Sequence, residues 1–209
     1  AGDAVVCGAE PKAKGCSRGT VGMLRGALAK AGAPENLVQA ITIPTIDATN
    51  ALLRHPDTGL ILATGGPGMV KAAYSSGNPA LGVGAGNGPA FIERTADVER
   101  AIKHVFDSKT FDNGTICASE QSIVVEACIR DKVVAAAERQ GGYFLDSEQS
   151  AKVARILLRP GGSMNPAIVG RSAERIAEMA GVTVPSGTRV LLSCEQTEVS
   201  HGNPYSREK

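Results

Sequence analysis

The sequence predicts an α/β protein in which helices cover the faces of a parallel β-sheet. Over roughly the first ninety residues, short apolar runs alternate with helical patterns of about ten residues, an order typical of strands joined by crossover helices. Hydrophobic residues make up 43% and charged residues 21% of the 209-residue chain. These fractions are ordinary for a folded protein that buries one large core or two small ones.

The elements of the first part follow from apolar runs bounded by turn residues. The predicted strands lie at residues 4–7, 38–43, 59–64 and 80–83. The predicted helices lie at residues 20–30, 45–55 and 69–75. The first of these helices is closed by Ala31-Gly32-Ala33-Pro34, a stop signal. Residues 82–89 form the most glycine-dense stretch, so we expect a boundary or hinge there.

The second part continues the same alternation. Its predicted strands lie at residues 90–93, 122–126 and 190–194. Its predicted helices lie at residues 97–106, 130–140, 148–158 and 173–180. Thr95 is the expected N-cap of the first of them. A start without Met and an end without a helix cap or strand closure predict that the sequence is a piece of a longer protein.

Composition argues against several classes of partner. A net charge of +1 gives no electrostatic reason to expect nucleic acid or a membrane, and 3% aromatic residues without Trp argue against a base-stacking surface. No apolar run reaches the ~18 residues of a membrane span. The five cysteines are scattered and form no CxxC pair. This pattern argues against a disulfide framework or a metal site and favours a reducing, cytoplasmic location.

Cys117 is the candidate catalytic residue. It follows the turn Asp112-Asn113-Gly114 at the end of a helical stretch, and an apolar strand begins at Ser122. A thiol in a loop between two regular elements can be both exposed and rigidly aimed, as a nucleophile must be. Backbone N–H groups of such a loop can also stabilise an oxyanion on a bound carbonyl. Cys7 and Cys194 lie inside predicted strands, so we expect them to be small buried hydrophobes.

Thr64-Gly65-Gly66-Pro67-Gly68 is the candidate nucleotide-binding turn. It follows a buried strand and opens a helix, so its backbone can approach a ligand closely and the helix N-terminus offers N–H groups to a phosphate or ribose. A tight strand-to-helix turn without a ligand explains the same residues equally well. The turn lacks the Gly-Lys-Ser/Thr ending of a Walker A loop and the GxGxxG spacing of the usual dinucleotide fingerprint.

No histidine offers a clear base for a Cys–His pair. His55 and His104 are expected on helix surfaces, and His201 lies in a polar loop. The sequence therefore favours a mechanism driven by the nicotinamide of a dinucleotide rather than by a protein base alone.

Two long motifs closely resemble those of the CoA-acylating aldehyde dehydrogenases. They are ILATGGPGMVKAAYSSG at residues 61–77 and SKTFDNGTICASEQ at residues 108–121. The resemblance covers essentially the whole chain and implies an aldehyde dehydrogenase fold with a Rossmann-like cofactor domain, a catalytic domain and an oligomerisation element. It implies that residues 1–92 are the second half of the NAD-binding domain. Residues 93–209 would then be the catalytic domain without its C-terminal part.

The same resemblance implies roles for single residues. Cys117 matches the family's nucleophile. Gly66 and Gly84 match cofactor-contacting glycines, and Glu208 resembles the glutamate that holds the nicotinamide ribose in the wider superfamily. The candidate cofactor-binding residues are Thr64, Gly65, Gly66, Gly84 and Glu208.

One substitution separates this chain from hydrolytic aldehyde dehydrogenases. Those enzymes carry Glu-Leu-Gly-Gly, whose glutamate activates water, whereas the matching stretch here is Gly82-Val83-Gly84-Ala85. An acyl thioester on Cys117 would then persist until the CoA thiolate arrives. The expected protein is a homo-oligomer (dimer, tetramer or filament) that interconverts a short aldehyde, CoA and NAD with acyl-CoA and NADH. A hydrolytic dehydrogenase and a non-catalytic assembly subunit are the alternatives.

Overall fold

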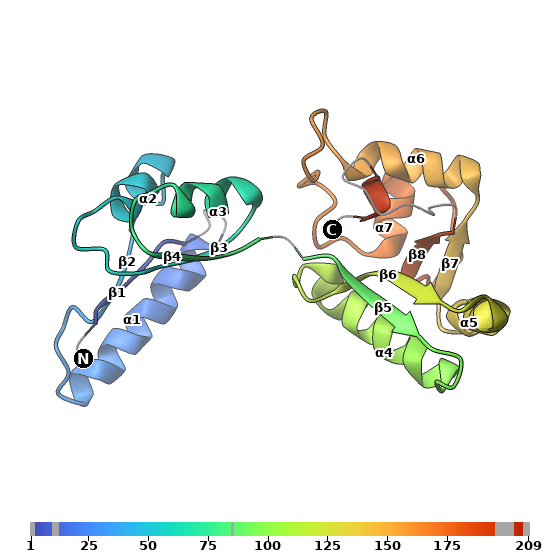
Figure 1. Ribbon diagram of the computed structural model, residues 1–209, viewed down its shortest axis with the longest axis horizontal. Helices are drawn as coiled ribbons and strands as arrows, with labels where there is room; N and C mark the ends of the chain where they lie inside the picture. The colour runs from blue at the N-terminus through green and yellow to red at the C-terminus, as the bar shows by residue number, and fades with distance from the viewer. Residues whose placement is uncertain (1–2, 10–12, 85, 195–202, 207–209) are drawn as a thin grey trace. The chain divides into compact units, whose positions relative to one another are not determined.

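The chain forms two compact units, Ala1–Gly84 and Ala85–Lys209 (Figure 1). The computed structural model describes residues 3–9, 13–84, 86–194 and 203–206. The boundary between the units lies within the glycine-dense stretch 82–89. Strand β5 (Gly88–Ile92) pairs with β6 (Glu120–Val125), and both strands belong to the second unit.

The first unit contains two parallel strand pairs. Its elements are β1 (Val5–Cys7), α1 (Lys14–Lys30), β2 (Val38–Ala40), α2 (Ile46–Leu53), β3 (Ile61–Thr64), α3 (Pro67–Tyr74) and β4 (Ala80–Val83). β1 pairs with β2 and β3 pairs with β4. α1 packs on β2, and α3 packs on both strands of the second pair. Because β3 and β4 are parallel, their carboxyl ends lie at the same edge.

The β3–β4 pair has one packed face and one open face. Ile61 and Ala63 are buried against Ala73 of α3, in a cluster that also contains Leu53. Residues between these positions point to the opposite face, as the two-residue repeat of a strand requires. There Leu62 is 74% exposed, and its register partner Leu81 is 60% exposed.

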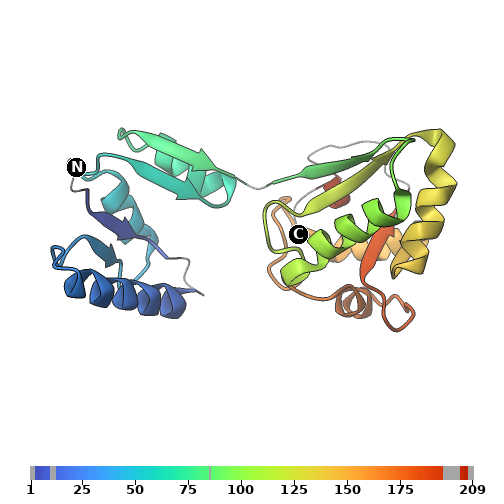
Figure 2. The same cartoon turned by 90° about the horizontal axis from the view of Figure 1, so that it is seen from below.

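The second unit contains two further parallel pairs, β5–β6 and β7–β8. Figure 2 shows β5 and β6 side by side. The remaining elements are α4 (Val98–Thr110), η1 (Phe111–Gly114), η2 (Ala127–Ile129), α5 (Arg130–Arg139), β7 (Gly142–Leu145), α6 (Ser147–Leu157), α7 (Ala173–Met179), β8 (Val190–Ser193) and η3 (Pro204–Ser206). α4 packs against α5 and against strands β5, β6 and β8.

Helix α4 supplies the centre of the larger core. Ile102 and Phe106, one helical turn apart, are fully buried between β5, β6 and α5, and each such burial stabilises the fold by about 1.5–3 kcal/mol. The helix is capped by Asp97, whose Oδ1 accepts from the Arg100 N–H at 3.1 Å. Asp97 therefore replaces the predicted cap Thr95, because the helix begins at Val98.

Three local expectations differ from the structure. α1 begins at Lys14 rather than at residue 20, because an exposed helix tolerates glycine at a cost of about 1 kcal/mol per residue. Strand β7 was not predicted, since it has only four residues and begins at the second glycine of a Gly-Gly pair. The expectation of buried thiols is wrong for Cys194, which is exposed just beyond β8, while Cys7 is half-buried.

Asp107 of α4 is bonded to two basic side chains, those of Lys103 and of Arg189, the residue before β8. Its carboxylate accepts from Lys103 and from Arg189, and these two hydrogen bonds hold the pKa of Asp107 below its usual value. A folded-state pKa below the unfolded value of about 3.9 contributes stability that is complete above that pH. This contribution is lost as the pH falls through the folded-state pKa.

We therefore expect Asp107→Asn to unfold at lower urea than the parent at pH 7, with a difference that narrows towards pH 3. Urea titrations at both pH values would measure the two midpoints. An equal difference between the urea midpoints of parent and variant at the two pH values would contradict the ion-pair explanation.

Candidate active site

Cys117 lies in the turn between η1 and β6, and its side chain is exposed. The turn is closed by the Ser119 N–H, which donates to the Ile116 carbonyl oxygen at 2.9 Å. The buried side chains of Phe106 and Ile102 anchor the preceding helix α4 in the core, and the following strand β6 is hydrogen-bonded to β5. The thiol is therefore accessible to solvent on a loop with both ends fixed by regular structure, as the sequence predicts.

The turn before Cys117 adopts a left-handed backbone. Asp112 and Asn113 have φ values of 48° and 50°, and Gly114 follows at 77°. Asn and Asp enter this region more readily than other side chains, because their short polar groups bond locally. Here the Thr115 hydroxyl donates to Asp112 Oδ2 at 2.6 Å, and Asn113 Nδ2 donates to the Gly170 carbonyl at 3.1 Å.

A second set of hydrogen bonds holds the loop from the other side. Lys109 Nζ donates to Gln121 Oε1 at 3.0 Å, and Gln121 Nε2 donates to the Ser119 carbonyl at 3.3 Å. Ser119 is only 2% exposed, and its hydroxyl has no hydrogen-bond partner among the described residues. The loop after Cys117 is thus held by the Gln121 side chain of β6, which Lys109 of α4 holds in turn.

The candidate nucleotide turn lies in the first unit, at the carboxyl edge of β3 and β4. Thr64 pairs with Val83 in register, and the Gly65 N–H donates to the Val83 carbonyl at 3.1 Å. This pairing brings Thr64, Gly65 and Gly66 next to Gly84. Sequence reasoning had placed all four in one site, and the structure brings them together.

The turn fits a phosphate or ribose. Gly66 is the N-cap of α3, Pro67 is the first helical residue, and the first turn contains no acidic side chain. A Cβ added at Gly66 or Gly84 would meet no atom within 4 Å, so the space above both glycines is open. An anion could therefore approach the N–H groups at the start of α3.

A glutamate at position 82, as in hydrolytic enzymes, would require neighbouring side chains of α3 to shift. A Cβ at Gly82 would lie 2.7 Å from Val70 Cγ1 and 2.8 Å from Tyr74 Cε2, both on α3. The Gly82 N–H also donates to the Tyr74 hydroxyl at 2.9 Å. Val70 and Tyr74 thus pack into the space that a side chain at position 82 would occupy.

Other predicted residues are not joined to these groups. Glu208 and His201 lie outside the described residues. His55 and His104 are exposed, as expected. Cys117 belongs to the second unit and the glycine turn to the first.

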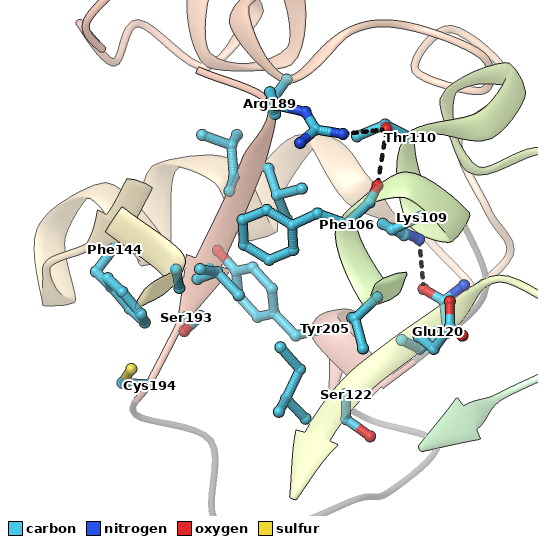
Figure 3. A pocket seen from close by; sticks show the side chains of 18 of the residues that line it. Phe106, Lys109, Thr110, Glu120, Ser122, Phe144, Arg189, Ser193, Cys194 and Tyr205 are labelled. Atoms are coloured by element: carbon cyan, nitrogen blue, oxygen red, sulfur yellow. Dashed lines mark hydrogen bonds between the residues drawn. The ribbon is translucent and has the colours of Figure 1, made fainter. Parts of the chain in front are cut away.

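A cavity of about 410 Å³ lies in the second unit between α4, β6, β8 and η3 (Figure 3). Phe106 and Tyr205 point into it, and Arg189 reaches Thr110 near one end. The Tyr205 hydroxyl donates to the Ser150 carbonyl at 2.6 Å, and burial raises the pKa of Tyr205 to about 12. Cys117 is not among the lining residues, so we do not assign this cavity to the reaction.

Among the residues that the structure describes, no group of three or more His, Cys, Asp or Glu side chains could hold a metal ion. In the same part of the chain, no helix is long and apolar enough to cross a membrane.

Sequence reasoning missed the residues that support the site. The Asn113 side chain is hydrogen-bonded to the Gly170 carbonyl, 57 positions away in the chain. No local sequence pattern predicts such a contact. Val70 and Tyr74 belong to the motif at residues 61–77, and their spacing of one helical turn places both on the face that meets β4. That spacing was the available signal.

In sequence, the model of the aldehyde dehydrogenase family matches residues 4–206. The bifunctional aldehyde-alcohol dehydrogenase of Escherichia coli K12 is 47% identical over 207 residues, which cover 99% of this chain and 23% of that protein.

Solved structures give the same result. A probable aldehyde dehydrogenase from Listeria monocytogenes EGD-e is 53% identical, with a TM-score of 0.94. An acetylating aldehyde dehydrogenase from Geobacillus thermoglucosidasius is 48% identical, with a TM-score of 0.92. Each comparison covers 99% of this chain and 45% of the solved chain, so the sequence spans a little under half of these relatives.

Proposed function

Because this chain belongs to the aldehyde dehydrogenase family, we propose that the protein interconverts a short-chain aldehyde, CoA and NAD with acyl-CoA and NADH. The observation that carries the proposal is the exposed Cys117 thiol on a turn held from both flanks. The names of two relatives, an aldehyde-alcohol dehydrogenase and an acetylating dehydrogenase, support the same reaction class.

Cys117 is the proposed nucleophile. Its thiolate adds to the aldehyde carbonyl carbon, forming a C–S bond and a thiohemiacetal oxyanion that nearby backbone N–H groups can stabilise. With NAD bound as the hydride acceptor, transfer of hydride from that carbon would leave an acyl thioester on Cys117. The CoA thiolate then attacks the acyl carbon, the C–S bond to Cys117 breaks, and the Cys117 thiolate is regenerated.

The turn at Thr64, Gly65 and Gly66, together with Gly84, is the proposed cofactor-binding site. When bound, NAD supplies the hydride acceptor for this chemistry. The open space above Gly66 and Gly84 and the N-terminus of α3 would accept a phosphate or ribose of the dinucleotide. The resemblance adds Glu208 as a candidate for the nicotinamide ribose.

Position 82 argues against the hydrolytic alternative. Gly82 has no side chain that could activate water. Val70 and Tyr74 occupy the space into which a side chain at this position would extend. An acyl thioester on Cys117 would therefore persist until it is attacked by CoA, whose thiolate is a better nucleophile than water.

We also propose a cytoplasmic homo-oligomer, with aldehyde and CoA as its small-molecule partners. None of the five cysteines, all of which the structure describes, is in a disulfide, and reduced cysteines suit a reducing compartment. The exposed apolar face at Leu62 and Leu81 is compatible with cover by further protein.

The test is peptide mass spectrometry of the intact protein after incubation with acetyl-CoA, with and without NADH. We expect one acetyl group, confined to Cys117 and removed when NADH is added. Label spread over all five cysteines would contradict the nucleophile assignment. Absence of label, with release of free acid from aldehyde and NAD alone, would favour the hydrolytic alternative.

A further inference from the structure

The segment Gly86–Asn87–Gly88 lies along the backbone that carries the nucleophilic thiol. A Cβ added at Gly86 would lie 2.0 Å from the Cys117 carbonyl oxygen and 3.1 Å from its carbonyl carbon. Two residues on, a Cβ at Gly88 would lie 3.7 Å from the Ser119 carbonyl oxygen, an ordinary contact. The approach is therefore closest at Cys117 itself.

The segment is also held from its other side. Asn87 Nδ2 donates to the Ser206 carbonyl in η3, and Tyr205 anchors η3 to α6 through the Ser150 carbonyl. From Gly88 onward the chain is paired with β6, with Gly88 opposite Glu120. Because it is fixed at Asn87 and at Gly88, the segment cannot simply retreat from Cys117.

From these contacts we propose that Gly86 is a positioning residue for Cys117, an inference that rests on the proposed role of Cys117 as nucleophile. Because Gly86 has no side chain, the segment can lie directly against the Cys117 peptide group. This contact fixes the position of the Cys117 backbone and therefore of its thiol. A methyl group there must displace the Cys117 backbone, since the atom it meets is a carbonyl oxygen and not the end of a flexible side chain.

The effect of a substitution at Gly86 is separable from backbone strain. The φ value of Gly86 lies outside the left-handed range that favours glycine, so alanine there brings no left-handed backbone strain. Gly88 shares this property and has room for a methyl group. Gly88→Ala is therefore the matched control for Gly86→Ala.

The experiment compares Gly86→Ala with Gly88→Ala in the intact protein. We expect Gly86→Ala to lower kcat about 100-fold, because displacement of a reacting group by about 1 Å has that effect, with KM values within about threefold of the parent. The rate of iodoacetamide labelling of Cys117, measured by peptide mass spectrometry and divided by that of the exposed Cys128, should change in Gly86→Ala and not in Gly88→Ala. Equal kcat and equal labelling ratios in the two variants would overturn the proposal.

Asn87→Ala keeps the test decisive if Gly86→Ala does not fold. The Asn87 side chain is exposed, and its removal frees the segment from η3 without adding an atom. The Cys117 labelling rate should change while that of Cys128 stays constant, and an unchanged Cys117 rate would overturn the proposal. If Cys117→Ser kept its turnover, the proposed function would fail, but the labelling ratios would still decide whether Gly86 positions the thiol.

Discussion

Replacing Cys117 by serine in the intact protein is expected to lower CoA-dependent turnover by at least about 10³-fold, because a hydroxyl is a far weaker nucleophile than a thiolate at neutral pH. NAD binding should persist, since Thr64, Gly65, Gly66 and Gly84 belong to the first unit. Steady-state formation of acyl-CoA and NADH, together with a fluorescence titration of NADH, measures both effects.

Cys128→Ser is the matched control for this substitution. Cys128 is also an exposed thiol of the second unit, but it lies in η2. We expect this variant to retain the turnover of the parent. Full turnover in Cys117→Ser, or equal losses in the two variants, would contradict the assignment of the nucleophile.

Much of the fold could be predicted from the sequence because its signals are local. The alternation of apolar runs and helical patterns indicated parallel strands, and the four strand pairs within the described residues are parallel. The aldehyde dehydrogenase fold and the resemblance to the CoA-acylating members are confirmed by relatives of 47% to 53% identity. Strand β7 was not predicted because a four-residue strand that itself begins with glycine carries almost no periodic signal.

The site could be predicted only as far as its motifs extend. The turn at Asp112 and Asn113 and the exposed thiol behind it are local features, and both are present. The contacts of Gly86 with Cys117 and of Asn113 with Gly170 join distant parts of the chain. Composition and spacing do not encode such contacts, because they arise only when separate elements pack together. The roles of Cys117 and of the glycines in the reaction stay predictions.

Restoring the missing glutamate by Gly82→Glu is expected to give no CoA-independent release of acid and to destabilise the first unit. The new Cβ would stand within 3 Å of Val70 and Tyr74, whereas ordinary contacts exceed 3.4 Å. Overpacking of this kind costs about 1–3 kcal/mol. Acid and acyl-CoA can be measured by chromatography, and stability by urea unfolding.

Alanine variants separate the packing effect from the charge of the glutamate. Gly82→Ala adds only the Cβ, and Gly59→Ala makes the same change where nothing lies within 4 Å. We expect Gly82→Ala to be less stable than Gly59→Ala by about 1 kcal/mol or more, with part of the loss recovered in a Val70→Ala background, as contacting residues couple. If the two alanine variants were equally stable, the packing around Gly82 would not explain the absence of a glutamate. In that case, acid release by Gly82→Glu would show that acylating and hydrolytic chemistry differ here by one side chain alone.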